Sequence, residues 1–432
     1  MKAGSHHNRR RFIFFALFGA LGGGVRTCPG QWTQWGGPHR DFKAPAGKLA
    51  DKWPSEGPPQ LWRRDLGEGY SAILADQGRL YTMYRRDGQE RTICLDANSS
   101  RTIWEDGFSV EPYEQMVRDF GKGPIGTPIL MGDTLITVGV TGIIKAFEVK
   151  TGKVLWSHDL VKEFDGKIHE FGYACSPMAY GKNVIVPVAG KSNGLMAFDS
   201  KTGRVAWKSP KLDISYASPI LIQVGGEDQI VFMTPTEVVG VAADGGALRW
   251  RYPHNPENRN NCFMPVWDEA GSRLFVASHS DIGAKLLQIG RSGDHWSVKE
   301  IWADPKIRLL HVSAVLNDGY VYACLGDEAP NFLAAVRLAD GKVMWRERGF
   351  PQAQPVEGDG KFILLDEEGQ LALVKATPEK CTVISTGHPF EKKTALADPP
   401  VPIVAWTVPT LVGERLYLRD KRIIMALDVG KR

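Results

Sequence analysis

The chain has 432 residues, of which 43% are apolar and 24% are charged, and this composition excludes a disordered or acidic, solvating chain. The formal net charge is +4, but residues 1–30 hold five basic residues and no acidic one, so the remainder carries −1. A nearly neutral body of this kind gives no electrostatic basis for binding nucleic acid or an anionic membrane surface, and we expect no nucleic-acid partner.

Residues 1–30 are predicted to be a cleaved signal peptide for export. Basic residues end at Arg11, and an apolar run follows from Phe12 to Val25. This run is shorter than the roughly 20 residues that span a bilayer, and it is typical of the apolar centre of a secretory signal. We therefore expect no transmembrane segment and a periplasmic or secreted location.

Two details of the leader leave the export route open. Residues Asn8–Phe14 resemble a twin-arginine export motif, while the ordinary basic start of a signal peptide is the alternative. Cys28 is a candidate lipid anchor, but Arg26 stands where small residues are expected before such a cysteine. No two of the other cysteines lie within 50 residues, so no Cys-x-x-Cys metal or redox motif exists. We expect them to be apolar fillers in strands, with no metal site; they are Cys94, Cys175, Cys262, Cys324 and Cys381.

From residue 58 onward the sequence repeats itself. A turn of the form Asp-x-x-Thr-Gly, or a variant of it, precedes a tryptophan in most units, and the tryptophans from Trp104 to Trp345 are 43 to 52 residues apart. Alternating apolar and polar runs between the turns indicate short strands. Four short strands per unit is typical of a β-propeller. We predict that these tryptophans lie on the outermost strands and dock each blade onto its neighbour: Trp62, Trp104, Trp156, Trp207, Trp250, Trp302 and Trp345.

A second marker, about thirty residues before each tryptophan, gives the number of blades. The eight markers begin at Ser71, Thr127, Ser176, Ser218, Met264, Ser313, Gln354 and Val408. The last unit stops before its tryptophan, whereas Pro58–Leu66 contains Trp62 with no strands before it. We therefore predict an all-β propeller of eight four-stranded blades, closed by an N-terminal strand, with seven blades as the alternative. We expect residues 58–432 to form a single propeller domain, preceded by an N-terminal extension of residues 31–57.

The repeated turn identifies a family resemblance. Asp-x-x-Thr-Gly-x-x-x-Trp, with leads such as Ala146-Phe147 and Ala197-Phe198-Asp199, resembles the pyrroloquinoline-quinone-like repeat of the quinoprotein alcohol dehydrogenase-like superfamily. The opening Gln31–Asp41 is similar to the start of many bacterial exported proteins of that group. The resemblance covers residues 31–432 and implies the fold. It leaves the function open, because this fold carries both enzymes and scaffolds.

One function that the resemblance implies is a quinoprotein dehydrogenase of alcohols or sugars, with a quinone and a calcium ion over the central channel. Calcium needs six to eight oxygen ligands, and only Glu68 and Asn261 offer plausible oxygens near the channel. Adjacent cysteines, common in such enzymes, are absent, as are other familiar catalytic motifs. Counting three residues back from the Pro position of each blade start gives a mostly apolar or aromatic ring: Gly69, Ile125, Ala174, Tyr216, Cys262, His311, Gln352 and Trp406.

The sequence therefore favours a non-catalytic binding or scaffold protein, with no catalytic residue and no cofactor expected. Exported propellers of this repeat type include a lipoprotein subunit of the machinery that inserts outer-membrane β-barrels, which implies protein partners; a small-molecule ligand is the alternative. Long segments after the tryptophans are predicted to project around the channel mouth, or to be solvated connectors: Glu105–Gly126, Ser157–Cys175, Arg251–Phe263 and Ser385–Thr407. The candidate binding residues, for which packing within the fold is the alternative, are Glu68, Tyr173, Tyr216, Asn261, His311 and Trp406.

Overall fold

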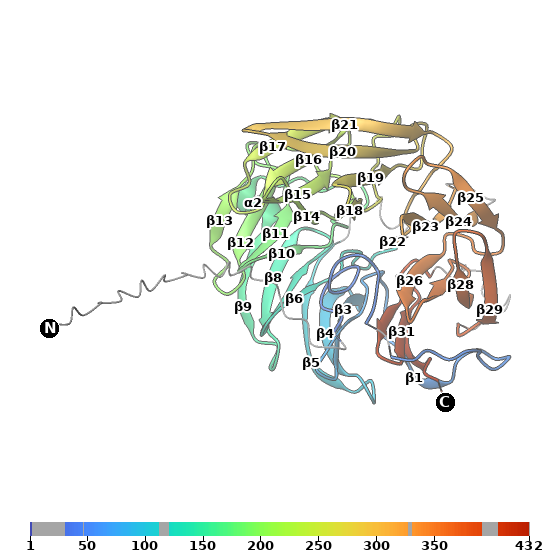
Figure 1. Cartoon of the computed structure of the whole chain (residues 1–432). Coiled ribbons are helices and arrows are strands. Elements are labelled where there is room, and N and C mark those ends of the chain that lie inside the picture. The colour runs from blue at the N-terminus through green and yellow to red at the C-terminus, as the bar shows by residue number, and fades with distance from the viewer. Residues whose placement is uncertain (2–30, 46, 112–120, 327–330, 391–404, 432) are drawn as a thin grey trace.

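The computed structural model describes residues 1 and 31–431, apart from 46, 112–120, 327–330 and 391–404. Within these residues the strands form eight antiparallel sheets of four strands each. Figure 1 shows the sheets arranged as blades of a ring. The prediction of an eight-bladed all-β propeller is confirmed.

In the first seven blades the chain runs from the innermost strand outward. The first blade contains β2 (Leu74–Asp76), β3 (Arg79–Arg86), β4 (Gln89–Asp96) and β5 (Thr102–Ser109). The second contains β6 (Ile129–Met131), β7 (Thr134–Val138), β8 (Ile143–Glu148) and β9 (Val154–Asp159). The third contains β10 (Met178–Tyr180), β11 (Asn183–Pro187), β12 (Leu195–Asp199) and β13 (Val205–Lys208). The fourth contains β14 (Ile220–Val224), β15 (Glu227–Met233), β16 (Glu237–Ala242) and β17 (Leu248–Pro253).

The second half of the ring follows the same order. The fifth blade contains β18 (Val266–Asp268), β19 (Arg273–Ala277), β20 (Ala284–Ser292) and β21 (His295–Asp304). The sixth contains β22 (Ala314–Asn317), β23 (Tyr320–Leu325), β24 (Phe332–Arg337) and β25 (Val343–Glu347). The seventh contains β26 (Gln354–Gly358), β27 (Lys361–Leu365), β28 (Leu371–Ala376) and β29 (Cys381–Gly387). The eighth contains β30 (Thr410–Val412), β31 (Arg415–Arg419), β32 (Ile423–Asp428) and β1 (Gln60–Asp65).

The ring closes as the sequence predicts. Strand β1 pairs antiparallel with β32, with Trp62 opposite Ala426 and Arg64 opposite Ile424. Figure 1 shows β1 beside the C-terminal strands. The first strand of the propeller thus supplies the outermost strand of the last blade, and this pairing covers an edge of β32 that would otherwise be open.

The repeated turn and its tryptophan form one docking device. The indole Nε1 of Trp104 donates to the Val149 carbonyl, and that of Trp156 donates to the Ser200 carbonyl, each at 2.9 Å and each in the next blade. The turn glycine of that next blade has a positive φ, +74° at Gly152, and a Cβ there would lie 2.5 Å from the Trp104 ring. The turn therefore needs glycine for two reasons: the backbone has a positive φ, and a Cβ at this position would collide with the indole ring.

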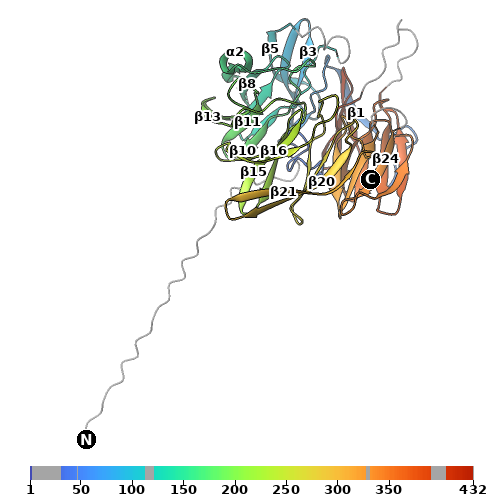
Figure 2. The same ribbon diagram turned by 90° about the horizontal axis from the view of Figure 1, so that it is seen from above.

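Trp250 differs from Trp104 and Trp156. Its Nε1 donates to Gln229 Oε1 at 2.7 Å, within its own blade, and the fifth blade has no Thr-Gly turn to receive it. Instead, the long β20–β21 hairpin reaches back over the fourth blade (Figure 1 and Figure 2). There Arg291 Nη1 donates to the Gly225 carbonyl at 3.2 Å. These two blades are therefore joined by the hairpin in addition to packing at the tryptophan.

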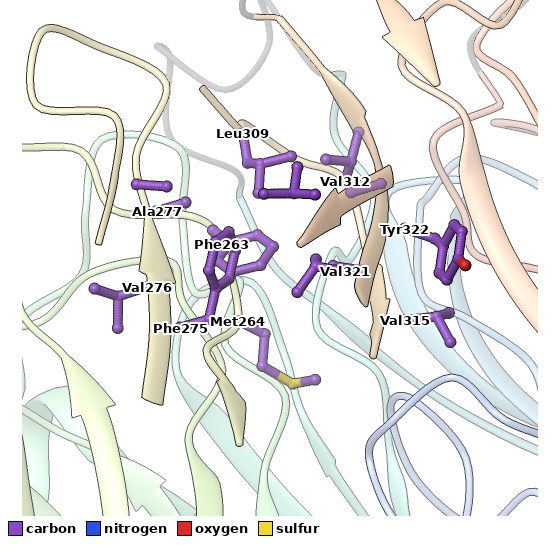
Figure 3. Close-up of a cluster of buried hydrophobic side chains, with 14 of the residues drawn as sticks. Phe263, Met264, Phe275, Val276, Ala277, Leu309, Val312, Val315, Val321 and Tyr322 are labelled. Atoms are coloured by element: carbon purple, nitrogen blue, oxygen red, sulfur yellow. The ribbon is translucent and has the colours of Figure 1, made fainter. Parts of the chain in front are cut away.

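The core lies between the blades. Figure 3 shows one such seam, where Phe275 and Ala277 of β19 lie near Val321 of β23, together with Phe263 and Val312 of the segments that enter the two blades. All are less than 5% exposed. Such close packing between neighbouring sheets stabilises the ring, because each blade buries both of its faces against its neighbours.

Short elements outside the sheets are few in the described part of the chain. Helix α2 (Leu160–Phe164), which the sequence did not predict, follows β9 and is capped by Asp159, whose carboxylate accepts from the amides of Val161 and Lys162. No helix of the described residues is long and apolar enough to cross a membrane. The predicted signal-peptide run Phe12–Val25 and the lipid-anchor candidate Cys28 lie outside the described residues.

Candidate functional site

The eight sequence markers begin at or up to three residues before the innermost strands. Their hydroxyl groups explain why serine and threonine recur there. The Ala72 amide donates to Thr127 Oγ1 at 3.1 Å, the Thr127 amide donates to Ser176 Oγ at 3.0 Å, and the Ser176 amide donates to Ser218 Oγ at 2.9 Å. Each hydroxyl therefore binds the start of the preceding blade. Met264 has no hydroxyl group with which to continue this series.

A central cavity of about 340 Å³ lies among these blade starts and the connections between blades. Six of the side chains that line it are aromatic: Trp35, Phe42, Tyr70, Phe171, Tyr216 and Trp406. The aliphatic and thioether side chains are Ile125, Ala174, Met264, Leu310 and Val312. The polar side chains, none of them a carboxylate, lysine or arginine, are Ser176, Ser218, Ser313, Asn260, Cys262, His279 and His311.

The N-terminal extension supplies the floor of this cavity. The Leu130 amide of the second blade donates to the Thr33 carbonyl at 2.8 Å, and the Glu357 amide of the seventh blade donates to the Phe42 carbonyl at 2.9 Å. Between these attachments Trp35 packs edge-on against Phe42, with ring centroids 5.5 Å apart. The segment thus crosses the channel from one side of the ring to the other.

Sequence reasoning missed this floor. Repeats place the blades, but the extension is not a repeat, and nothing in its spacing indicates where it lies. A signal was nevertheless present: Trp32, Trp35, Phe42 and Trp53 are more large aromatics than an exposed tail of this length carries. Trp32, Phe42 and Trp53 are at most 4% exposed.

The ring of eight residues counted from the sequence largely surrounds the cavity. Six of the eight line it: Ile125, Ala174, Tyr216, Cys262, His311 and Trp406. The structure therefore brings together three of the six candidate binding residues, since Tyr216, His311 and Trp406 belong to this set. Trp406 stacks on Tyr70 with centroids 5.4 Å apart and contacts the His311 ring at 5.7 Å.

The other three candidate residues do not line the cavity. The Tyr173 ring is 2% exposed, and its hydroxyl donates to the Pro187 carbonyl at 2.9 Å. The Asn261 amide is fully buried, where it donates to the Thr234 carbonyl at 2.7 Å and accepts from Ser278 Oγ. These two side chains fill hydrogen-bonding positions within the wall, because adjacent residues of a chain turn their side chains in different directions.

Glu68 is also directed elsewhere. Its Oε2 accepts from the Lys122 amide at 3.3 Å, and its backbone pairs with Arg85. The carboxylate therefore belongs to the connection after the first blade. Gln352, the seventh member of the counted ring, is 7% exposed and also lies outside the cavity lining.

One of the two histidines that line the cavity, His311, is uncharged at physiological pH. Burial lowers the pKa of His311 to about 4, and the neighbouring His279 acts in the same direction, so the imidazole is uncharged. Burial raises the pKa of the Cys262 thiol to about 12, so this sulfur is not a reactive thiolate. Among the described residues, no three His, Cys, Asp or Glu side chains gather where they could hold a metal ion.

The cysteines in the described part of the chain form no disulfide. Cys94, Cys175 and Cys324 are buried, as expected of small apolar fillers, but Cys175 and Cys262 lie in connections between blades and not in strands. Cys262 also lines the cavity. The expectation that all five fill strands is therefore wrong for these two residues.

The loops between blades are shorter than the sequence suggested, because the outer strands continue past the tryptophans. Strand β5 runs to Ser109, and the third residue after Trp156 already caps α2. All four segments reach the cavity, through Ile125, Phe171, Asn260 and Trp406. Residues 112–120 of the first segment lie outside the described residues.

A second hollow, of about 680 Å³, lies on the other side of the floor. Arg40 lines it, and its Nη1 donates to the Pro177 carbonyl at 3.1 Å. Burial lowers the pKa of this guanidinium to about 9. Asp41, Asp228, Glu269 and Lys43 also border the hollow, so its charges are mixed. The floor thus separates a cavity without carboxylate, lysine or arginine in its described lining from a charged hollow.

Comparisons with known proteins return two classes of relative. The chain is 23% identical to polyvinylalcohol dehydrogenase of Sphingopyxis over 46% of its length, a match that spans only 35% of that enzyme. It is 19% identical to outer membrane protein assembly factor BamB of Yersinia pestis over 58% of its length, spanning 63% of that protein. The chain thus covers less than two thirds of either relative.

Solved structures show the same fold. The chain superposes on BamB from Moraxella catarrhalis with a TM-score of 0.58, 13% identity, and coverage of 86% of this chain and 99% of that one. A europium-containing methanol dehydrogenase gives a TM-score of 0.65 at 13% identity, covering 91% of this chain and 89% of that one. The profile of a PQQ-like repeat family matches residues 94–347, more than half of the sequence. The chain therefore belongs to this family, which is described as outer membrane protein assembly factor BamB.

Proposed function

We propose that this chain is a non-catalytic binding propeller, which holds a ligand or partner at the open end of its central cavity. One observation carries the proposal: the described lining of the cavity contains aromatic, aliphatic and neutral polar groups but no carboxylate, lysine or arginine. Such a lining favours binding by apolar contact. It lacks the carboxylates and lysines that often act as general acids and bases, and burial lowers the pKa of the lining His311 to about 4, which makes this imidazole a weak base.

The quinone and calcium ion of a quinoprotein dehydrogenase do not fit this site. Calcium takes six to eight oxygen ligands, among them carboxylates, whereas the cavity offers serine and tyrosine hydroxyls and the Asn260 amide. Glu68 and Asn261 are the two residues whose oxygens the sequence suggested as calcium ligands. Both side chains make their hydrogen bonds outside the cavity. Glu367 lies behind Trp406, where its Oε2 accepts from the indole Nε1 at 3.1 Å.

The share of each relative that the match covers also favours a binding protein over a dehydrogenase. The match to the Yersinia assembly factor spans 63% of that protein, whereas the match to polyvinylalcohol dehydrogenase spans 35% of the enzyme. A protein partner for this chain is therefore part of the proposal. So is export to the periplasm or beyond, for which the basic and apolar leader of residues 1–30 is the support.

A spectroscopic and kinetic experiment tests the proposal. The purified protein is incubated with pyrroloquinoline quinone and calcium, desalted, and examined for a visible quinone band and for reduction of an electron-accepting dye with alcohols and sugars. We expect no retained quinone and no dye reduction above the protein-free control. A stoichiometric quinone band together with substrate-dependent dye reduction would establish the enzyme instead.

A further inference from the structure

We propose that the central cavity binds a small, uncharged aromatic molecule. This inference rests on the proposed function and adds the chemical class of the ligand. Three properties of the cavity carry it: it is closed at one end, its walls present flat rings, and its described lining has no carboxylate, lysine or arginine.

The closed end is the floor made by the N-terminal extension. Trp35 and Phe42 meet edge to face, with an interplanar angle of 87°, and both rings border the cavity. Gly36 and Gly37 between them have φ of +75° and +80°, and a Cβ on Gly37 would lie 3.1 Å from the Trp32 ring. The glycines therefore allow the chain to turn tightly enough to bring two aromatic rings to the channel axis.

Flat rings also form the walls. Trp406 stands between Tyr70 and His311, with centroids 5.4 Å and 5.7 Å away. A second group has Tyr216 at its centre, tilted against His169 at 4.7 Å and against Phe171 at 5.8 Å. Rings arranged in this way offer faces and edges to another ring, and such contacts stabilise aromatic pairs beyond the burial of area.

The absence of carboxylate, lysine and arginine from the described lining decides the charge of the ligand. A carboxylate or ammonium group brought here would lose its water without gaining a partner of opposite charge, which is unfavourable. A phenol or carbonyl group would lose less, because Ser176, Ser218 and Asn260 supply hydrogen-bonding atoms. The volume of about 340 Å³ suits a molecule of one or two rings, at the small end of ligand cavities.

One buried cation opposes this argument. Arg40 lies under the floor, is 7% exposed, and makes no salt bridge within the described residues. Its positive charge would attract an anion in the cavity. Its guanidinium, however, lines the hollow on the far side and donates to the Pro177 carbonyl, so we expect the desolvation of the anion to outweigh the attraction.

Calorimetric titration of the purified full-length protein tests the inference with probes matched in size. The probes are 2-naphthol, which is uncharged at pH 7, and 2-naphthoate, which carries a carboxylate. We expect 2-naphthol to bind one per chain and 2-naphthoate to bind at least about tenfold more weakly. Equal or tighter binding of 2-naphthoate overturns the inference, as does failure of 2-naphthol to bind up to its solubility limit.

Two matched variants locate the binding. Ala174→Phe fills the cavity, whereas Ala179→Phe makes the same change on β10 at a residue that lines the other hollow. We expect the first variant to lose 2-naphthol binding and the second to retain it, with thermal unfolding of both confirming that they fold. Should Ala174→Phe not fold, Ala174→Leu serves the same purpose. Binding retained in the cavity-filled variant overturns the inference. A different result would overturn the proposed function, namely substrate-dependent reduction of the dye in the presence of the quinone and calcium.

Discussion

The guanidinium of Arg419, on β31 of the last blade, donates to the Met83 carbonyl on β3 of the first blade at 2.6 Å. It also donates to the carbonyls of Ser71 and Gly67 and is fully buried. Burial lowers the pKa of this group to about 10, so it remains a cation at physiological pH. These carbonyls and the Thr82 hydroxyl, whose Oγ1 accepts from the guanidinium at 3.0 Å, hold this charge at the seam where the two ends of the ring meet.

We predict that Arg419→Met destabilises the ring. The change removes the bonds and leaves buried carbonyl oxygens without donors, which should lower the free energy of unfolding by at least about 3 kcal/mol. Arg415→Met, on the same strand but exposed, removes surface contacts with Asn98 and Tyr417 and should cost less than about 1 kcal/mol. Urea unfolding measures both. Equal costs would mean that Arg419 does not hold the seam.

Deletion of residues 31–66 should produce a protein that aggregates. It removes β1 and so exposes the edge of β32, which can then pair with another chain. Trp62→Ala should lower stability but leave the protein soluble, because it removes one side chain and keeps the strand. Size-exclusion chromatography separates these outcomes. A soluble, equally stable deletion variant would refute closure by the N-terminal strand.

Trp156→Ala should cost about 3–5 kcal/mol, as for other buried tryptophans. Its ring is 9% exposed, and its Nε1 donates to Ser200 of the next blade. Trp207→Ala should also destabilise, but less, because this ring is more exposed and its Nε1 has no hydrogen-bond partner. Thermal unfolding tests the order. If neither variant shifts the transition by more than about a degree, these residues do not dock the blades.

Glu90 should make stability fall with rising pH. Burial raises its pKa to about 7, although the amide of Val140 and the charges of Arg85 and Lys145 act in the opposite direction. Between about pH 4.5 and 7 the folded state therefore keeps a proton that the unfolded state has released, so stability from this group is present at low pH and lost as pH rises.

Glu90→Gln should remove this dependence. The difference in unfolding free energy between variant and wild type should grow in favour of the variant from pH 4.5 to 7, by at most about 3 kcal/mol. Taking the difference cancels the other titrating groups, including His254 and His311, whose pKa values are lowered. A difference that stays constant over this range would show that Glu90 ionises normally.

The sequence predicted the ring but only part of the cavity, for a physical reason. Repeats set which residues start each blade, and six of the eight positions counted from those starts line the cavity. A count along the chain does not give the direction of a side chain. Tyr173 and Asn261 were therefore predicted to face the cavity, whereas their side chains lie inside its wall. Such a count also cannot predict the position of a segment without repeats. For this reason Trp35 and Phe42 were not predicted to line the cavity.

The most direct test of the account is the electron density in the central cavity of a crystal soaked with 2-naphthol, beside a second crystal soaked with pyrroloquinoline quinone and calcium. We predict a bicyclic ring in the first crystal, between Trp406 and Tyr216 and above Trp35, and no quinone or calcium in the cavity of the second. A quinone held there with a coordinated calcium ion, or 2-naphthol found only in the hollow beyond the floor, would contradict the account.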